Sequence, residues 1–235
     1  MKTFYLIAAF AFLPFVLSLS EPGVSDHLGT NKNHPYKKDG KGVLLVYAGS
    51  FQSPQFSYDI GIHFEMNPSI GMSYQVTFER GDNVLSHIAI FYKFSKPNQS
   101  TIYNYLTRHS YISYNNGGED GDPHAEVAGS ETIDKYACTH LQNLDNDKDH
   151  TSKDDFWMSK SLPGFQSIVQ VLNQLNSDAG SLVINGTIFK WGGLVKMTHY
   201  FEDKKTGATQ NAVINLVEAN PTMSFPASDF DVPSN

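Results

Sequence analysis

The clearest pattern in the chain is a strict alternation of apolar and polar residues that begins near residue 56. Successive side chains of a strand point to opposite faces, so a period of two predicts a strand with one face in the core and one in water. The inward positions would be Phe56, Tyr58, Ile60, Ile62, Phe64 and Met66. Further strands are expected over residues 72–79 and 84–94, with short turns between them. Such connections predict an antiparallel meander.

Two later stretches show helical spacing instead. A helix is predicted over residues 131–144, where Ile133, Ala137, Leu141 and Leu144 form one apolar stripe, and another over residues 165–175. The last third returns to strands, with one hairpin around Asn185–Gly186 and one around residues 203–207. Strands and helices in separate blocks predict an α+β fold: an antiparallel β-meander plus C-terminal β-hairpins, with two amphipathic helices packed on the sheet.

The two ends of the chain differ from its middle. Lys2 and the apolar run that follows are typical of a secretory signal peptide, which we place at residues 1–20. A membrane anchor is the alternative, but the run is short for a bilayer and Pro14 interrupts it. Residues 21–40 are expected to be a disordered N-terminal segment, residues 41–218 a single α+β domain, and residues 219–235 a flexible C-terminal tail. We therefore expect a secreted protein with no transmembrane segment after cleavage.

Composition narrows the partners and the covalent chemistry. The net charge is −7, and residues 119–155 hold eleven acidic and three basic side chains. This excess disfavours a nucleic-acid partner, because phosphate neutralisation needs clustered Lys and Arg. Cys138 is the only cysteine, so it is expected to be buried or to pair with another chain. Asn98 and Asn185 begin sequons that predict N-glycans in a eukaryotic secretory pathway.

One acidic stretch has the spacing of the first three ligands of an EF-hand calcium loop: Asp145, Asp147 and Asp149. His150 stands where that loop needs glycine, and Phe156 stands where it needs a bidentate glutamate. A regular EF-hand is therefore excluded. Two interpretations stay open: a looser site closed by Asp154 or Asp155, and a solvated acidic loop.

A second acidic stretch alternates carboxylate and imidazole side chains: Asp120, Asp122, His124 and Glu126. An extended backbone would point all four the same way, and this mixture of ligands suits zinc or manganese. Pro123 and the neighbouring glycines favour an exposed loop instead. No cofactor is certain from the sequence, and Ca²⁺ or another divalent metal is the candidate.

A tyrosine-rich stretch between residues 102 and 114 is the candidate binding surface. If it forms one strand, a single face carries Tyr103, Tyr105, His109 and Tyr111. Amphipathic aromatic rings dominate many binding surfaces and can stack on sugars. Packing between neighbouring strands is the alternative role for these rings.

No motif in the sequence assigns a reaction. We expect a secreted glycoprotein that acts by extracellular binding to a carbohydrate or protein ligand, on a cell surface or in the matrix, with a divalent metal as an option. The alternative is an extracellular hydrolase built from clustered carboxylates and histidine, such as His63 with Glu65. The third hypothesis is a membrane-inserting β-hairpin, because strands of alternating hydrophobicity also form pores. Binding is favoured over catalysis, and the question of enzyme activity stays open.

Overall fold

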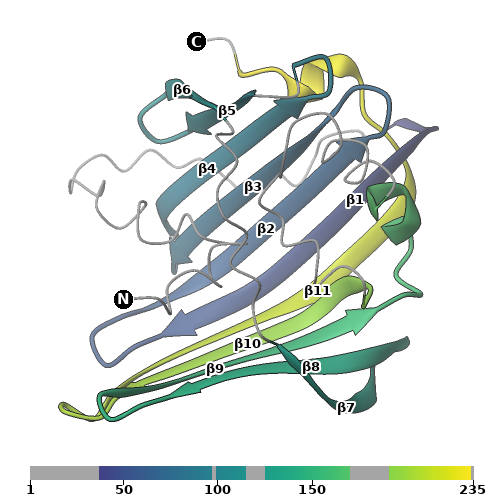
Figure 1. Cartoon of the computed structure of the whole chain (residues 1–235). Coiled ribbons are helices and arrows are strands. Elements are labelled where there is room, and N and C mark those ends of the chain that lie inside the picture. Colours follow the sequence, from purple (N-terminus) through teal and green to yellow (C-terminus); the bar gives the residue numbers. More distant parts are fainter. Residues whose placement is uncertain (1–36, 97–98, 115–124, 170–190, 234–235) are drawn as a thin grey trace.

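The computed structural model describes residues 37–96, 99–114, 125–169 and 191–233, and it is built almost entirely of strands. They form one antiparallel sheet in the order β6-β5-β4-β3-β2-β1-β11-β10-β9-β8-β7 (Figure 1). A 3-10 helix, η3 (Ala227–Phe230), follows the last strand, and a helical turn covers residues 165–169. The strands are β1 (Lys37–Gln52), β2 (Ser57–Asn67), β3 (Gly71–Arg80), β4 (Asn83–Lys93), β5 (Gln99–Asn104), β6 (His109–Tyr114), β7 (Glu126–Ile133), β8 (Tyr136–Asn146), β9 (His150–Ser159), β10 (Gly193–Asp203) and β11 (Ala208–Ser224).

The predicted α+β fold is wrong, because the described residues form a nearly all-β structure and include no pair of amphipathic helices packed on the sheet. The antiparallel meander itself is present in β2, β3 and β4, and the hairpin expected around residues 203–207 joins β10 to β11. Of the helix expected over residues 165–175, residues 165–169 are helical and the others lie outside the described residues. The hairpin expected at Asn185–Gly186 also lies outside them.

The helix expected over residues 131–144 is instead part of the β7–β8 hairpin. Ile133 pairs with Tyr136 across a two-residue turn, Asp134–Lys135, in which Asp134 adopts φ 52°. A positive φ at the first turn position suits the twist of a tight hairpin. The turn at Asp134–Lys135 therefore overrides the helical spacing of the four apolar residues. This turn contains no glycine, so the sequence marks it only weakly.

The sheet extends beyond both boundaries that we placed on the domain. β1 begins at Lys37, inside the segment 21–40, and β11 runs to Ser224, past residue 218. The signal peptide predicted at residues 1–20 and the rest of that N-terminal segment lie outside the described residues. None of the helices in the described ranges is long and apolar enough to cross a membrane.

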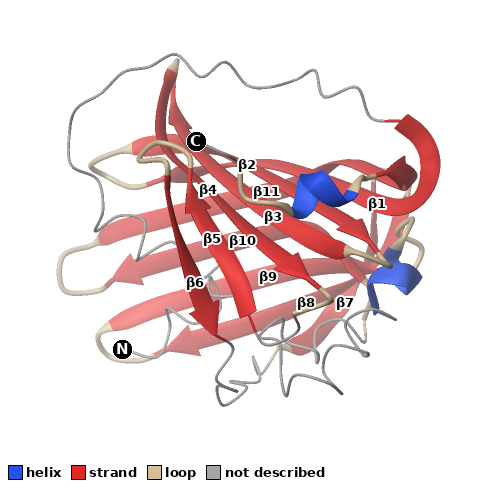
Figure 2. Ribbon diagram, turned by 90° about the horizontal axis from the view of Figure 1, so that it is seen from above, coloured by secondary structure: helices blue, strands red, loops and turns tan. Residues whose placement is uncertain are grey.

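The sheet is strongly curved, so that it has an inner, concave face and an outer face (Figures 1 and 2). Its end strands, β6 and β7, do not pair with each other. The Tyr47 hydroxyl on β1 donates to the carbonyl oxygen of Leu194 on β10, 3.1 Å away, and so reaches across β11. Burial, and then the phenol of Tyr136 on β8, raise the pKa of Tyr47. These contacts between distant strands identify the face of Tyr47 as the inner one.

Strand pairing aligns the inner side chains in rows that cross the strands. One such row consists of Ile60, Gly49, Ile214, Met197, Phe156 and Leu141, on β2, β1, β11, β10, β9 and β8 in turn. Glycine is required in this row because a Cβ on Gly49 would lie 2.0 Å from the carbonyl oxygen of Val213. The close approach of β1 and β11 therefore depends on a missing side chain.

The C-terminal segment covers part of the outer face. Phe225 and Phe230 are each 1% exposed and pack with Leu44 of β1. Asn67 at the end of β2 donates a 3.0 Å hydrogen bond from Nδ2 to the carbonyl oxygen of Phe225. Residues 225–230 are thus fastened to the sheet.

Candidate functional site

The inner, concave face of the sheet is lined mainly by apolar side chains. Its central side chains are buried in a single hydrophobic cluster that spans both halves of the sheet. Near one end, the rings of Phe51 and Tyr58 stack with centroids 4.9 Å apart, and Phe78 meets Tyr58 edge-on at 5.2 Å. The fully or nearly fully buried members on the strands include Val43, Leu45, Tyr47, Ile60, Ile62, Met66, Met72, Tyr92, Leu141, Phe156, Met158, Val195, Met197 and Ile214.

The row of Phe51 and Tyr58 changes from apolar to polar as it crosses the sheet. Phe51 pairs with Ala212, Ala212 with His199, and His199 with Asp154. Nδ1 of His199 lies 2.7 Å from Oδ1 of Asp154, and both side chains are buried. A carboxylate this close fixes the ring and leaves Nε2 as the nitrogen that can face another group.

Ser152 adds a third polar group to this end of the inner face. It lies two residues before Asp154 on β9, so both side chains point to the same face, and it pairs with Phe201 on β10 and Asp145 on β8. The residue is 2% exposed, and its hydroxyl has no hydrogen-bond partner. We call Ser152, Asp154 and His199 the polar cluster.

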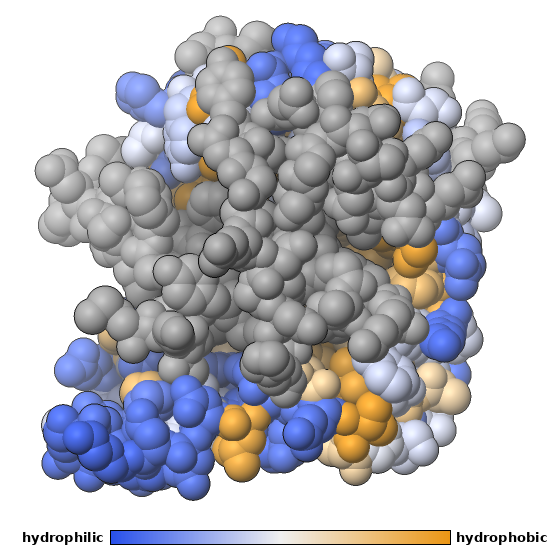
Figure 3. Space-filling model, viewed as in Figure 1, coloured by the Kyte–Doolittle hydropathy of each residue, from blue (hydrophilic) through white to orange (hydrophobic). Residues whose placement is uncertain are grey.

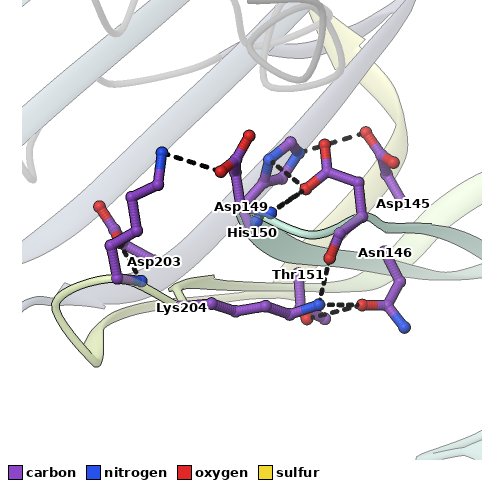
Figure 4. Close-up of polar contacts among 9 residues, drawn as sticks. Asp145, Asn146, Asp149, His150, Thr151, Asp203 and Lys204 are labelled. Atoms are coloured by element: carbon purple, nitrogen blue, oxygen red, sulfur yellow. Dashed lines mark hydrogen bonds and ion pairs between the residues drawn. The ribbon is translucent and has the colours of Figure 1, made fainter.

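The acidic stretch that resembles the start of a calcium loop forms the tip of the β8–β9 hairpin, at the strongly hydrophilic end of the molecule (Figures 3 and 4). Oδ1 of Asp147 accepts hydrogen bonds from the backbone amides of Asp149 (2.7 Å) and His150 (2.8 Å). These amides, first that of His150, lower the pKa of Asp147. Nε2 of His150 lies 3.4 Å from Oδ2 of Asp145. The carboxylates at this tip thus build the turn itself.

The neighbouring β10–β11 hairpin supplies the counter-charges for this tip. Nζ of Lys205 lies 2.8 Å from Oδ1 of Asp149, and Lys204 donates to Oδ1 of Asn146 at 2.6 Å and to the carbonyl oxygen of Asp147 (Figure 4). Two lysines therefore occupy the positions that a cation would take. The residues proposed to close a looser calcium site, Asp154 and Asp155, lie within β9 on opposite faces instead.

The second acidic stretch is only partly described. Asp120, Asp122 and His124 lie outside the described residues, and Glu126 is an exposed residue of the edge strand β7. Among the side chains that the structure describes, no group of three or more His, Cys, Asp or Glu residues is placed to hold a metal. The sequon residues Asn98 and Asn185 also lie outside the described ranges, so both glycans stay predictions.

The predicted tyrosine surface is split between two strands and two faces. A turn after Asn104 separates β5 from β6, and Tyr103 pairs with Ser110 while Tyr111 pairs with Ile102. Tyr103 and Tyr105 therefore belong to the outer face, where Tyr103 is buried, whereas His109 and the exposed Tyr111 lie on the other face. The single aromatic face expected from the sequence does not form, because the chain reverses in the middle of the stretch.

The histidine and carboxylate proposed for a hydrolase lie on the outer face of β2. Glu65 is buried and accepts a hydrogen bond from Ser73 at 3.2 Å, whereas the side chain of His63 is exposed.

His87 on β4 stacks on Tyr105 with centroids 4.0 Å apart. Burial and then the nearby His63 lower the pKa of His87 to about 4. This neutral, stacked imidazole packs as an aromatic ring.

Another polar group that sequence reasoning missed surrounds Trp157 on the outer face of β9. His140 stacks on its indole at 4.6 Å, and Lys196 Nζ lies 4.7 Å from the ring centroid. Asp155 lies beside them, 2.8 Å from Nε2 of His140. Burial would raise the pKa of Asp155, but hydrogen bonds from Gln142, Lys153 and His140 outweigh it and lower that pKa. This carboxylate is saturated by its neighbours and has a structural role.

The polar cluster was also missed as a unit, although the sequence carries a signal for two of its residues, Asp154 and His199. Asp154 stands two positions before Phe156, and His199 stands two positions after Met197, so both occupy inward positions of alternating strands. A polar side chain at an inward position is costly unless it is paired. Their partnership depends on the β9–β10 register.

Cys138, the lone cysteine, is buried and free on β8.

Several solved structures match the fold at low similarity. A domain from Vibrio parahaemolyticus assigned to the outer membrane lipoprotein-sorting proteins has 10% identity and a TM-score of 0.34, with 83% of this chain and 92% of that chain covered. A LolA superfamily protein from Nitrosomonas europaea has 12% identity and a TM-score of 0.31, with 86% and 93% covered. PNGF-II has 10% identity and a TM-score of 0.43, and the match spans 80% of this chain but 29% of that one. Similarity at this level does not extend to function.

The sequence comparisons are more specific about the family. No protein of curated function matches the chain. Residues 98–235, more than half of the 235 residues, match a family described as a domain of unknown function, DUF4412. The chain therefore belongs to the DUF4412 family.

Proposed function

We propose that this chain is an exported binding protein that holds an apolar ligand, such as the hydrocarbon part of a lipid, against the inner face of its sheet. One observation supports this proposal above all: the paired strands align apolar side chains in an unbroken row on that face, from β2 across β1, β11, β10 and β9 to β8. Small-molecule sites are concave and lined mainly by apolar and aromatic side chains, with a few polar groups that fix orientation. The inner face and its polar cluster have this composition.

Two further features support a binding role. The sheet is not closed into a barrel among the described residues, since its end strands β6 and β7 do not pair, so the two halves could separate to admit a ligand between them. The signal peptide predicted at residues 1–20 would deliver the protein to an extracytoplasmic compartment, where water-insoluble ligands need carriers.

A hydrocarbon fluorophore such as diphenylhexatriene tests the proposal directly. We expect its fluorescence to rise saturably with the protein and long-chain lipids to displace it. Ala212→Phe places a ring on the inner face between Phe51 and His199, and it should weaken binding at least roughly tenfold by steric exclusion. Ala48→Phe, at an exposed outer position of β1, is the matched control and should bind normally.

Two outcomes contradict the proposal. Wild-type protein with native circular dichroism that gives no saturable signal would exclude this function. Equal affinity of the Ala212→Phe and Ala48→Phe variants would move the ligand away from the inner face.

Binding to a carbohydrate, a cell surface or matrix is a second proposal, and it depends on one observation. Tyr111 is 47% exposed on β6, next to Ile112 at 51%, at the free edge of the sheet. An exposed aromatic ring at an edge can stack on a sugar. A glycan array probed with wild-type protein and Tyr111→Ala tests it, and the absence of any signal that Tyr111→Ala removes would reject it.

A further inference from the structure

We propose that Ser152, Asp154 and His199 form a polar subsite that binds the hydroxyl headgroup of an uncharged long-chain amphiphile. This inference deepens the function proposed above and rests on it. The hydrocarbon chain would lie along the aromatic end of the same row, toward Phe51 and Tyr58.

The first argument concerns the unpartnered hydroxyl of Ser152. A buried polar group without a hydrogen bond costs on the order of 1–3 kcal/mol, so its presence calls for an explanation. Alanine or valine would fit a strand at this position without that cost. Ser152 instead presents its hydroxyl on the inner face, next to Phe201 and in line with Asp154. A ligand that hydrogen-bonds to Oγ explains why a serine stands there.

The second argument concerns the position of the buried pair. Asp154 and His199 share one inner row with Ala212, Phe51 and Tyr58, so a polar headgroup at the pair leaves the chain free to follow the row. From β9 to β2 the row spans four strand spacings, roughly 19 Å at about 4.8 Å each. This length favours a long-chain ligand over a short one.

The third argument identifies the headgroup. Among β8, β9, β10 and β11 the only basic residues other than histidine are Lys153 and Lys196, and both belong to the outer face. An anionic headgroup would thus meet the Asp154 carboxylate with no lysine or arginine of these four strands to offset it. A hydroxyl can accept a hydrogen bond from Ser152 and donate one to Asp154 or to Nε2 of His199. The donor and acceptor set therefore matches an alcohol.

A series of ligands with the same chain length separates the headgroup from the chain. Displacement of bound diphenylhexatriene is measured with dodecane, 1-dodecanol, dodecanoate and dodecylammonium. We expect 1-dodecanol to bind about tenfold more tightly than dodecane, as one or two good hydrogen bonds predict. Dodecanoate and dodecylammonium should both bind more weakly than the alcohol.

Substitutions in the polar cluster then test which residues cause the preference for the alcohol. Ser152→Ala should reduce the ratio of alcohol to alkane affinity at least threefold while leaving dodecane affinity unchanged. Ser152 makes no side-chain hydrogen bond, so this variant should fold. Ser50→Ala, on the outer face of β1, is the matched control and should keep the wild-type ratio. His199→Gln is the second variant and should also lower the ratio if its circular dichroism is native.

The outcomes distinguish this inference from the proposed function. If none of the ligands displaces the fluorophore, the proposed function fails. If dodecane and 1-dodecanol bind equally, or if dodecanoate or dodecylammonium binds best, the function stands and the hydroxyl subsite is rejected. An unchanged ratio in Ser152→Ala also rejects the subsite.

Discussion

His199 and Asp154 are 45 residues apart in the sequence, yet Nδ1 of His199 lies 2.7 Å from Oδ1 of Asp154 on neighbouring strands. Both side chains are at least 94% buried, so each polar group depends on the other. Removing one partner of a buried pair leaves an uncompensated polar group.

We expect Asp154→Ala to lower the free energy of unfolding by about 3 kcal/mol, because it leaves the buried imidazole of His199 without its carboxylate partner. Urea denaturation followed by circular dichroism measures the change. Asp59→Ala, at an exposed outer position of β2, is the control and should stay within roughly 0.5 kcal/mol of wild type. A loss below roughly 1 kcal/mol for Asp154→Ala would show that the pair contributes little.

Burial and the nearby His63 lower the pKa of His87 from 6.5 to about 4, which makes stability depend on pH. Between these values the unfolded chain binds a proton at this site and the folded chain does not. Stability therefore falls as the pH decreases through this window, by up to about 3 kcal/mol from this residue. His87→Phe keeps a ring against Tyr105 without a titrating group, so its stability should vary less between pH 7 and pH 4. Parallel curves for the two proteins would contradict the assignment.

Gly164 has φ 80°, and a Cβ there would lie 2.6 Å from Cγ1 of Val43. Gly81 has φ 57° with open space around it, so it isolates the backbone effect. We expect Gly81→Ala to cost about 1 kcal/mol and Gly164→Ala roughly 3 kcal/mol. In a Val43→Ala background the cost of Gly164→Ala should approach that of Gly81→Ala. Thermal unfolding of the wild type, the three single variants and the Val43→Ala/Gly164→Ala double variant checks this. Equal costs for the two glycine substitutions would rule out the steric contact.

Phe230 is 1% exposed on η3 and packs with Phe225 and Leu44. Phe230→Ala should therefore destabilise the protein by about 3 kcal/mol, as expected for a truncated buried ring. Val217, which is 66% exposed on β11, is the control, and Val217→Ala should have little effect. If both variants unfold at the wild-type denaturant midpoint, the C-terminal segment does not contribute to the core.

Calcium should not bind at the tip of the β8–β9 hairpin, because backbone amides, Lys204 and Lys205 already occupy its oxygens. We expect the same Tm for wild-type protein in excess calcium and in excess chelator. A calcium-dependent rise in Tm that Asp147→Asn abolishes would contradict this. A rise abolished only by Asp122→Asn would place the metal in the other acidic stretch.

Strands with a strict period of two were predictable because burial of one face and exposure of the other determine their pattern. Phe56 to Met66 alternates without exception, and its apolar side chains from Tyr58 to Met66 form the inner face of β2 as expected. The β7–β8 hairpin was not predictable in the same way, since Ile133 and Leu141 fit helical and strand spacing alike. The turn at Asp134–Lys135 decides between them, and its positive φ falls on an aspartate, which sequence rules mark less strongly than glycine.

The candidate site could be anticipated only residue by residue. Asp154 was read as part of an acidic loop because it follows Asp145 and Asp149 closely in sequence. In the sheet, however, register matters more than proximity along the chain: Asp154 pairs with His199 on β10, while Asp145 pairs with Ser152. Register between strands that are far apart in sequence is set by the whole sheet, which local patterns do not encode.

The family match, residues 98–235, has a consequence for how the protein can be divided. It supplies β5 and β6 on one side of the sheet and β7 to β11 on the other, with β4, β3, β2 and β1 between them. A recombinant fragment cut at residue 98 would consist of two separated pieces, each with a newly bared strand, β5 or β11, as a template for aggregation. Expression of this family region as a soluble unit should therefore require the residues from Lys37 onward.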